Sequence, residues 1–201
     1  MIVSINTSET QILRDIKKLH LKNEQIEIDT TYNIGAMYKD VEELKPKIKT
    51  DKTYYPEINI IMNIKNIPLR NESISSVMYD PPFLCRTGQA KNRDKTAERF
   101  GYYTSREEQL NEYQKAIGEI QRVLKPCGIV IIKIGDMKGN KYYSSHVDII
   151  NMLTEKKLAV IDIFIKIRVR DQNKKNENQR VAKQMHTFFI IAKKKRRYTK
   201  Q

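Results

Sequence analysis

Apolar and polar positions along this 201-residue chain follow two different patterns, which predict strands separated by helices. Short apolar runs bounded by turn-forming residues indicate buried strands. Apolar residues spaced three and four apart indicate amphipathic helices, and a Ser followed three residues later by Gln or Glu marks two helix starts, at Ser8 and Ser105. The predicted strands are residues 26–29, 47–51, 58–62, 77–79, 128–134, 158–169 and 186–192. The predicted helices are residues 8–20, 36–44, 105–124 and 144–156.

Length and composition place the chain in a broad class. A chain of 201 residues with 39% hydrophobic residues is long enough for one domain with a sizeable core. The mean hydropathy of −0.64 predicts a soluble protein, and no apolar run is long enough for a membrane span or placed as a signal peptide. The two cysteines, Cys85 and Cys127, show no metal-ligand spacing, so we expect free thiols, a cytoplasmic location and no metal site.

Positive charge is concentrated near the C-terminal end of the chain. The net charge is +14, and the segment 166–201 contributes +11 of it through 13 Lys and Arg against two acids. Such a patch is typical of a protein that binds a polyanion, although a solvated, lysine-rich surface gives the same count. A second basic segment follows residue 84. The residues predicted to bind nucleic acid in these two segments are Arg86, Lys91, Arg93, Arg99, Lys174, Lys175 and Arg180.

The stretch most indicative of chemistry is Asp80-Pro81-Pro82-Phe83, directly after the predicted strand 77–79. Two consecutive prolines end the strand and form a rigid extended corner. A carboxylate and a fixed backbone carbonyl can together accept the two hydrogens of an exocyclic amino group, which frees its lone pair for attack. An aromatic ring after the prolines can stack on the base that carries this amine. The alternative is an ordinary strand-ending turn.

Asp80-Pro81-Pro82-Phe83 resembles the D/N/S-P-P-Y/F/W motif of the amino-methyltransferases, which transfer a methyl group from S-adenosylmethionine to a base nitrogen. The resemblance implies that Asp80 and the Pro81 carbonyl accept from the amine, that Pro82 shapes the corner, and that Phe83 stacks on the base. The segment Arg122-Val-Leu-Lys-Pro-Cys127-Gly-Ile-Val resembles the R-x-L-K-P-G-G lead-in of class I methyltransferases, with Cys127 in place of the first glycine.

Residues 29–35 resemble the D-P-F-x-G-x-G cofactor loop of class I methyltransferases, in which a strand ends in an acid before a tight turn. Asp29 and Gly35 match the pattern, Thr30 replaces the proline, and Asn33 replaces the first glycine, which Asn can do because it tolerates positive φ. A plain strand-turn-helix unit is the alternative. The resemblance implies that the methyl donor is bound by Asp29, Thr31, Tyr32, Asn33, Gly35, Asp51 and Asn63.

Together these segments imply a Rossmann-like α/β fold over residues 1–192. Its features are a mostly parallel seven-stranded sheet, helices on both faces, a C-terminal antiparallel hairpin, an N-terminal helical extension at residues 1–24 and a basic tail at 193–201. Lys133 and Asp136 are expected at the carboxyl end of their strand, facing the ligand crevice or forming an ion pair. His20 and His146 are expected at the surface.

The function implied is methylation of the adenine N6 amino group in DNA. RNA adenine, cytosine N4, a small-molecule or protein glutamine substrate, and a catalytically silent nucleic-acid-binding relative remain alternatives. The recognition sequence, the strand state of the nucleic acid and the oligomeric state, including a homodimer or a partner subunit, are left open by the sequence.

Overall fold

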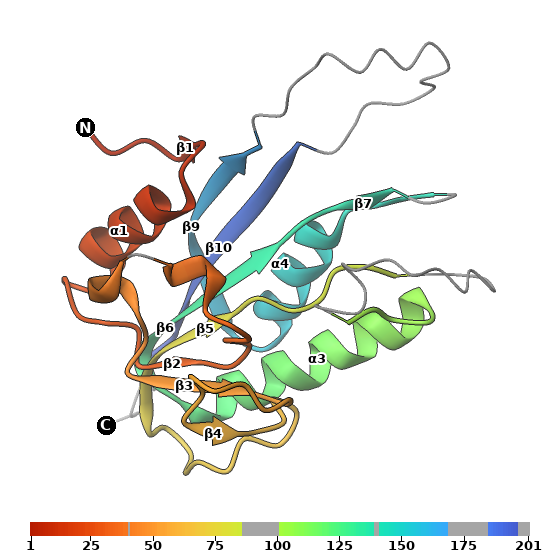
Figure 1. The fold of residues 1–201 in the computed structure, drawn as a ribbon. Helices are drawn as coiled ribbons and strands as arrows, with labels where there is room; N and C mark the ends of the chain where they lie inside the picture. Colours follow the sequence, from red (N-terminus) through yellow and green to blue (C-terminus); the bar gives the residue numbers. More distant parts are fainter. Residues whose placement is uncertain (40, 86–100, 139–140, 169–184, 197–201) are drawn as a thin grey trace.

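The computed structural model describes residues 1–39, 41–85, 101–138, 141–168 and 185–196. In these residues one large twisted sheet lies between helices on its two faces (Figure 1). The strands of this sheet are β1 (Ile5–Asn6), β2 (Ile28–Asp29), β3 (Ile48–Asp51), β4 (Ile60–Ile61), β5 (Ile74–Tyr79), β6 (Leu124–Ile134), β9 (Leu158–Ile167) and β10 (His186–Lys194). A separate two-stranded ribbon consists of β7 (Met137–Lys138) and β8 (Tyr142–Tyr143).

The strand order in the sheet is β1-β9-β10-β6-β5-β2-β3-β4. All neighbouring strands are parallel except β10, which is antiparallel to both β6 and β9. The predicted parallel sheet and antiparallel hairpin are therefore confirmed. The chain runs outward from β2 through β3 to β4, then returns to β5 on the other side of β2. The order thus reverses between β2 and β5, which is where open α/β sheets bind ligands.

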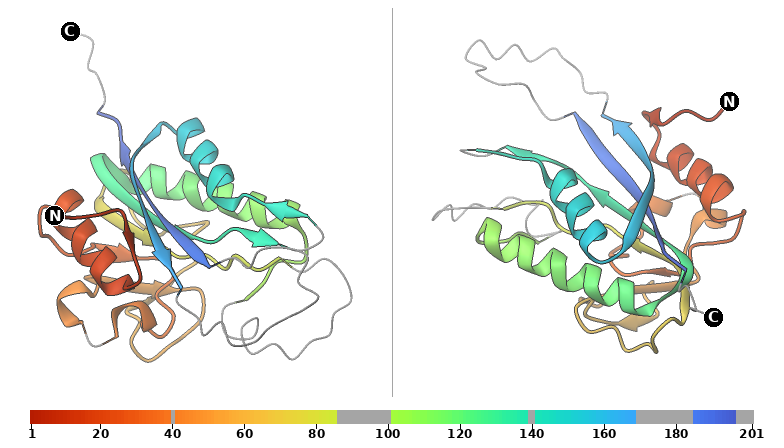
Figure 2. Two further views of the ribbon diagram at one scale, coloured as in Figure 1. Left: turned by 90° about the horizontal axis from the view of Figure 1, so that it is seen from above. Right: turned by 180° about the vertical axis from the view of Figure 1, so that it is seen from behind.

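Helices cover both faces of the sheet, as predicted. Helix α1 (Glu9–His20) lies on one face, and α3 (Arg106–Val123) and α4 (Ser145–Glu155) lie on the other (Figure 2). Successive side chains of a strand point to opposite faces, so β6 serves two cores. Val130 and Ile132 pack in the cluster that includes α3 and α4, whereas Ile131 packs in the cluster that includes α1. Both predicted helix caps are confirmed, because Ser8 and Ser105 accept from the backbone N–H groups three residues ahead.

The predicted helix over residues 36–44 is wrong. The structure has two 3₁₀ turns there, η1 (Ala36–Tyr38) and η2 (Glu42–Leu44), separated by extended backbone at Lys39. Apolar residues at Tyr38, Val41 and Leu44 are all buried, and their spacing of three matches the period of a 3₁₀ helix as well as one face of an α-helix. The spacing alone therefore did not distinguish the two.

The N-terminal segment is an integral part of the fold. Strand β1 pairs in parallel with β9, with Ile5 opposite Ile165, and adds an eighth strand to the seven predicted. Ile12, Leu13 and Ile16 of α1 are buried in the second core. Strand β1 was not predicted, because a two-residue strand is too short to show alternation.

Candidate active site

Asp80 lies at the carboxyl end of the central strand β5, as predicted. Strands β5 and β6 are in register with Tyr79 opposite Ile132, so the next residues, Asp80 and Lys133, stand side by side. The Lys133 Nζ is 2.9 Å from the Asp80 Oδ2. The Asp80 side chain is 23% exposed, which leaves it open at this edge of the sheet.

Lys133 also contacts Glu9, the first residue of α1, with 2.7 Å between Nζ and Oε1. Glu9 is in turn ion-paired with Lys166 of β9. These four residues, Asp80, Lys133, Glu9 and Lys166, form an alternating row of charges that we call the charge row. Its members come from four separate elements, and neither Glu9 nor Lys166 was among the residues that the sequence indicated for the site.

Burial sets the protonation behaviour of this row, and the neighbouring charges modify it. Burial raises the pKa of the Asp80 carboxyl, and the ammonium of Lys133 opposes that rise. Burial alone lowers the pKa of Lys133, but the Asp80 and Glu9 carboxylates outweigh it and hold that pKa above its ordinary value. Burial likewise raises the pKa of Glu9, and Lys133 and Lys166 bring it below its ordinary value. Lys133 is thus a fixed positive charge beside Asp80.

The corner at Asp80 is joined to the loop that follows β2. The Asp80 backbone N–H donates to the Thr31 hydroxyl over 2.7 Å, and the Thr30 N–H and hydroxyl donate to the Met78 carbonyl. Strand β2 is the direct neighbour of β5, so these bonds cross the point where the strand order reverses. The predicted donor loop and the predicted catalytic corner therefore meet.

Asp29 organises the loop from inside. It is 2% exposed; its Oδ1 accepts from the Thr31 N–H at 2.8 Å and its Oδ2 accepts from the Tyr38 hydroxyl at 2.7 Å. Burial raises the pKa of Asp29 to about 7, although the hydrogen bonds from Thr31 and Tyr38 oppose the shift. Asp29 therefore holds the loop through hydrogen bonds inside the protein, and the residues that face a ligand must be others.

Two residues of the loop adopt left-handed backbone, Asn33 with φ of 53° and Gly35 with φ of 65°. The expectation that Asn33 takes the positive φ of a glycine is confirmed. Gly35 is required for a second reason, because a Cβ there would lie 2.4 Å from the Tyr32 hydroxyl. Tyr32 is 3% exposed and stacks on Tyr38, with ring centroids 5.6 Å apart. The space beside Gly35 is therefore filled by the protein's own Tyr32 side chain.

Asp51 and Asn63 lie after the next two strands in the sheet. Asp51 ends β3, and its two carboxylate oxygens accept from the backbone N–H groups of Asn33 and Thr53, both at 3.0 Å. Each oxygen keeps a further lone pair for a hydroxyl group. Asn63 follows β4 and is exposed, with its Oδ1 accepting from the Lys65 N–H. Both side chains thus keep hydrogen-bonding capacity at this edge of the sheet.

Pro82 and Phe83, the second half of the Asp80–Phe83 motif, contact α3 and the residue that follows β6. Phe83 is half-buried against Gly135, where an added Cβ would be 3.3 Å from the Phe83 ring. The Pro82 carbonyl accepts from the buried Tyr113 hydroxyl of α3 at 2.7 Å. Pro81 is buried, and among the described residues its carbonyl accepts no hydrogen bond.

Of the two alternatives for Lys133 and Asp136, the ion pair between them is wrong. Lys133 points to the face covered by α1, whereas Asp136 binds the Tyr142 hydroxyl at 2.7 Å and the His146 Nδ1 at 2.7 Å. His146 is 27% exposed in its side chain and stacks on Phe188, so it is only partly at the surface. His20 is likewise only partly exposed, with its Nε2 2.8 Å from the Asp162 Oδ2.

The residues predicted to contact nucleic acid lie outside the described residues. They are Arg86, Lys91, Arg93, Arg99, Lys174, Lys175 and Arg180. In the described part of the chain, no group of three or more His, Cys, Asp or Glu side chains is arranged to hold a metal ion. None of the helices described there combines the length and apolar character needed to cross a bilayer.

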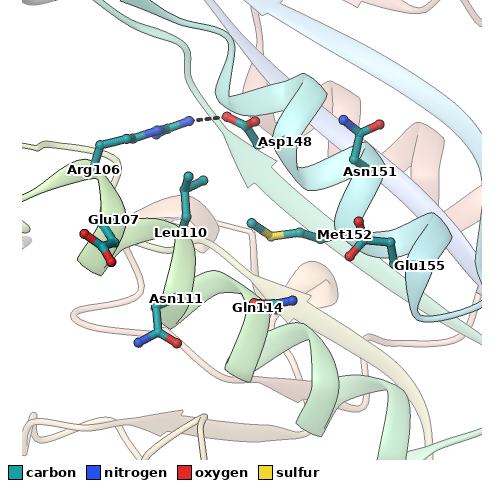
Figure 3. A pocket seen from close by; sticks show the side chains of 9 residues that line it. All are labelled: Arg106, Glu107, Leu110, Asn111, Gln114, Asp148, Asn151, Met152 and Glu155. Carbon is teal, nitrogen blue, oxygen red and sulfur yellow. Dashed lines mark hydrogen bonds and ion pairs between the residues drawn. The ribbon is translucent and has the colours of Figure 1, made fainter.

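A groove of about 700 Å³ lies apart from this site, between α3 and α4 (Figure 3). The ion pair of Arg106 with Asp148 bridges the two helices at one end of it. None of the residues that the sequence indicated for donor or base binding lines this groove. The candidate site is therefore the open edge of the sheet at Asp80.

No protein-family model matches this chain, and no curated protein matches it in sequence. Solved structures do match. A SAM-dependent methyltransferase from Methanosarcina mazei is 13% identical, with 90% of this chain and 98% of that chain covered and a TM-score of 0.53. The 1,6-didemethyltoxoflavin-N1-methyltransferase from Burkholderia thailandensis is 12% identical, with 94% and 80% covered and a TM-score of 0.55.

The TTHA0409 protein of Thermus thermophilus, described as a DNA modification methylase and solved with S-adenosyl-L-methionine, is 19% identical with a TM-score of 0.46. The match covers 67% of this chain and 53% of that one, so the chain spans about half the length of TTHA0409. At these identities the matches with TM-scores above 0.5 establish the fold. The chain has the fold of the class I methyltransferases that use S-adenosylmethionine.

Proposed function

We propose that this protein transfers a methyl group from S-adenosylmethionine to the N6 amino group of adenine in DNA. The observation that carries the proposal is the position of Asp80-Pro81-Pro82-Phe83. The motif stands at the carboxyl end of β5, directly beside the loop after β2, at the reversal of the strand order. A plain strand-ending turn has no reason to stand there.

Asp80 and the Pro81 carbonyl are the acceptors for the two amino hydrogens. The exocyclic nitrogen is a weak nucleophile because its lone pair is delocalised into the ring. Accepting both hydrogens favours a tetrahedral nitrogen with the lone pair free, and the acceptors are fixed before the substrate arrives. Phe83, held against Gly135, supplies a stacking surface for the extruded base.

Donor binding is assigned to the loop after β2 and to the ends of β3 and β4. Asp51 accepts from ribose hydroxyls, Asn63 contacts the adenine, and the backbone of residues 29–35 lies nearest the methionine part. Asp29, Tyr32 and Gly35 support that loop from within, since Asp29 and Tyr32 are buried and Gly35 makes room for Tyr32. When bound, the donor supplies an electrophilic methyl group, and positioning by the protein accounts for much of the rate.

DNA is the favoured polymer because a motif for a base amine accompanies a strongly basic chain of net charge +14. Asp at the first motif position favours adenine over cytosine, following the resemblance. RNA adenine and cytosine N4 are the nearest rivals. A catalytically silent relative is the rival from a different class, and the filling of the Gly35 space by Tyr32 is the observation in its favour.

The test is transfer of labelled methyl groups from S-adenosylmethionine to DNA and to RNA, followed by digestion to nucleosides. Label in N6-methyldeoxyadenosine that is lost in Asp80→Ala supports the proposal. The matched control is Glu155→Ala on the exposed side of α4, which should retain wild-type activity. Donor binding is measured in parallel by calorimetry. A folded chain that neither binds the donor nor labels a polymer overturns the proposal in favour of the silent relative.

The basic residues outside the described part of the chain are tested by salt dependence. If Lys174, Lys175 and Arg180 contact phosphates, replacing all three with Ala should reduce the slope of log K against log salt by about 0.9 per lost contact on duplex DNA. An unchanged slope would remove them from the interface while leaving the chemistry at Asp80 untouched.

A further inference from the structure

The ion pair between Lys133 and Asp80 follows from the way the sheet is built. Parallel pairing of β5 with β6 brings the two residues side by side, both on the face covered by α1. The Lys133 ammonium binds the Oδ2 of Asp80, and among the described residues the Oδ1 accepts no hydrogen bond. One oxygen of the carboxylate is thus held and the other is left available.

Without a partner, the Asp80 carboxylate would rotate about its Cβ–Cγ bond, and either oxygen could face the substrate in many orientations. Fixing Oδ2 removes this freedom before the substrate binds, as preorganised acceptors require. We propose that Lys133 is a positioning residue, which orients Asp80 so that its Oδ1 receives the substrate amine, and that Glu9 of α1 balances the charge of Lys133. This inference rests on the proposed function for its substrate.

The need for Glu9 follows from the charge that develops in the reaction. The attacking nitrogen becomes positive as it gains the methyl group, so a carboxylate beside it is favourable and an ammonium is not. Glu9, 2.7 Å from the Lys133 Nζ, offsets that ammonium, and Lys166 binds the other oxygen of Glu9. The four side chains of the charge row, from α1, the end of β5, β6 and β9, then sum to zero charge when all are ionised. The buried Asp29 of β2 is a further carboxyl that interacts electrostatically with Asp80, and it adds a negative charge when it is ionised.

A merely structural ion pair, tying α1 to the sheet, is the competing explanation. It predicts loss of stability when either partner is removed, and it predicts shifts in the Asp80 titration, because any nearby charge acts on a carboxylate. It predicts no loss of kcat in a folded variant at a pH where Asp80 is ionised, whereas the positioning role predicts such a loss. The titration shows whether the contacts with Asp80 exist in solution. Removing Lys133 takes away a charge that lowers the Asp80 pKa, whereas removing Glu9 takes away one that raises it.

The first experiment follows the Asp80 carboxyl by NMR in protein labelled with ¹³C-aspartate, assigned with Asp80→Asn. Relative to wild type, Lys133→Met should move the titration midpoint upward by about one pH unit or more, and Glu9→Gln should move it downward. Lys166→Met is the matched control, since it removes a lysine of the same row that contacts Glu9 but does not contact Asp80. It should move the midpoint less than Lys133→Met does.

The second experiment measures methyl transfer against pH with the same variants. Because the ionised carboxylate is the active form, Lys133→Met should shift the acid limb of kcat to higher pH and lower kcat about tenfold or more, with little change in the KM for the donor. Lys133→Arg should recover part of kcat. If Lys133→Met does not fold, the double variant Glu9→Gln/Lys133→Met is used in place of the single variant. The double variant removes one charge of each sign, so the net charge of the charge row stays at zero.

The outcomes separate the two claims. Unchanged Asp80 titration in Lys133→Met, or an unchanged kcat in that variant at a pH where Asp80 is ionised, overturns the positioning role even if the wild type methylates DNA. Titration shifts of the expected signs in the variants, with no methyl transfer by the wild type, confirm the contacts of Asp80 with its charged neighbours but overturn the proposed reaction and with it the positioning role.

Discussion

The backbone N–H of Asp80 donates a hydrogen bond to the hydroxyl of Thr31, with 2.7 Å between nitrogen and oxygen. The two residues are 49 positions apart in the chain and follow the neighbouring strands β2 and β5, on either side of the reversal in strand order. This bond connects the loop assigned to the methyl donor with the corner assigned to the methyl acceptor. Any shift of one segment is therefore transmitted to the other.

Thr31→Val should weaken this connection. The substitution keeps the shape of the side chain but leaves the partly buried Asp80 N–H without its acceptor, which costs about 1–3 kcal/mol of unfolding free energy. We expect a lower kcat together with weaker donor binding, measured by kinetics and calorimetry. Thr31→Ser keeps a hydroxyl and should behave much more like wild type. A loss in Thr31→Ser with little loss in Thr31→Val would show that the methyl group, and not the hydrogen bond, matters.

Gly135→Ala should act on Phe83. The added Cβ would be 3.3 Å from the Phe83 ring, so the ring must move by a few tenths of an ångström. We expect kcat/KM for the nucleic acid to fall about tenfold, because small misplacements in an active site are costly. Donor affinity should not change. Gly118→Ala in α3, where the nearest side-chain atom is 4.0 Å away, is the control and should leave activity intact.

Gly35→Ala should destabilise the protein through two effects. Its φ of 65° is unfavourable for any residue with a Cβ, and that Cβ would approach the Tyr32 hydroxyl to 2.4 Å. Backbone strain of this kind costs about 1–3 kcal/mol, before the clash is counted. Chemical denaturation measures the total. Adding Tyr32→Leu should recover the part due to the clash; a double variant no more stable than Gly35→Ala would argue against the packing described here.

Asp29 should make stability depend on pH. Its pKa is about 7 in the folded protein against an ordinary 3.8, so between these values the folded state binds a proton that the unfolded state does not. The unfolding free energy therefore falls as pH rises from about 4 to 7, by roughly 4 kcal/mol at most. Asp29→Asn lacks this proton and should flatten the dependence. Denaturation curves at pH 5 and pH 8 measure the change in unfolding free energy. The same change with pH in wild type and in Asp29→Asn would contradict the raised pKa of Asp29.

Local signals in the sequence predicted much of the fold. The capping residues Ser8 and Ser105, the left-handed turn at Asn33 and the strand before Asp80 all depend on residues within a few positions of each other. Cys127, which stands where a glycine was expected, has a φ of 64° and so occupies the conformation for which glycine is suited. The prediction failed at residues 36–44, where a spacing of three fitted two kinds of helix.

The charge around Asp80 could not be predicted in this way. The sequence identified Asp80 and noted Lys133, but the ion pair that it offered as one alternative for Lys133 was with Asp136. Pairing of β6 with β5 supplies Asp80 to Lys133 instead, whereas Asp136 follows the end of β6 and binds Tyr142 and His146. Glu9 carried no signal at all, because a glutamate in the first turn of a helix is an ordinary helix-stabilising residue.

The amino-acid sequence alone was sufficient for most of the strands and helices and for the proline corner that ends at Phe83, and its motifs, through their resemblance to the methyltransferases, for the parallel α/β class. Periodicity, turn chemistry and capping act over a few residues, so they can be read without the fold. Only the folded sheet decided that Lys133 binds Asp80, that Thr31 supports the corner and that Tyr32 fills the space beside Gly35. The Lys133–Asp80 and Thr31–Asp80 contacts join residues 53 and 49 positions apart, and strand order and register bring such residues together.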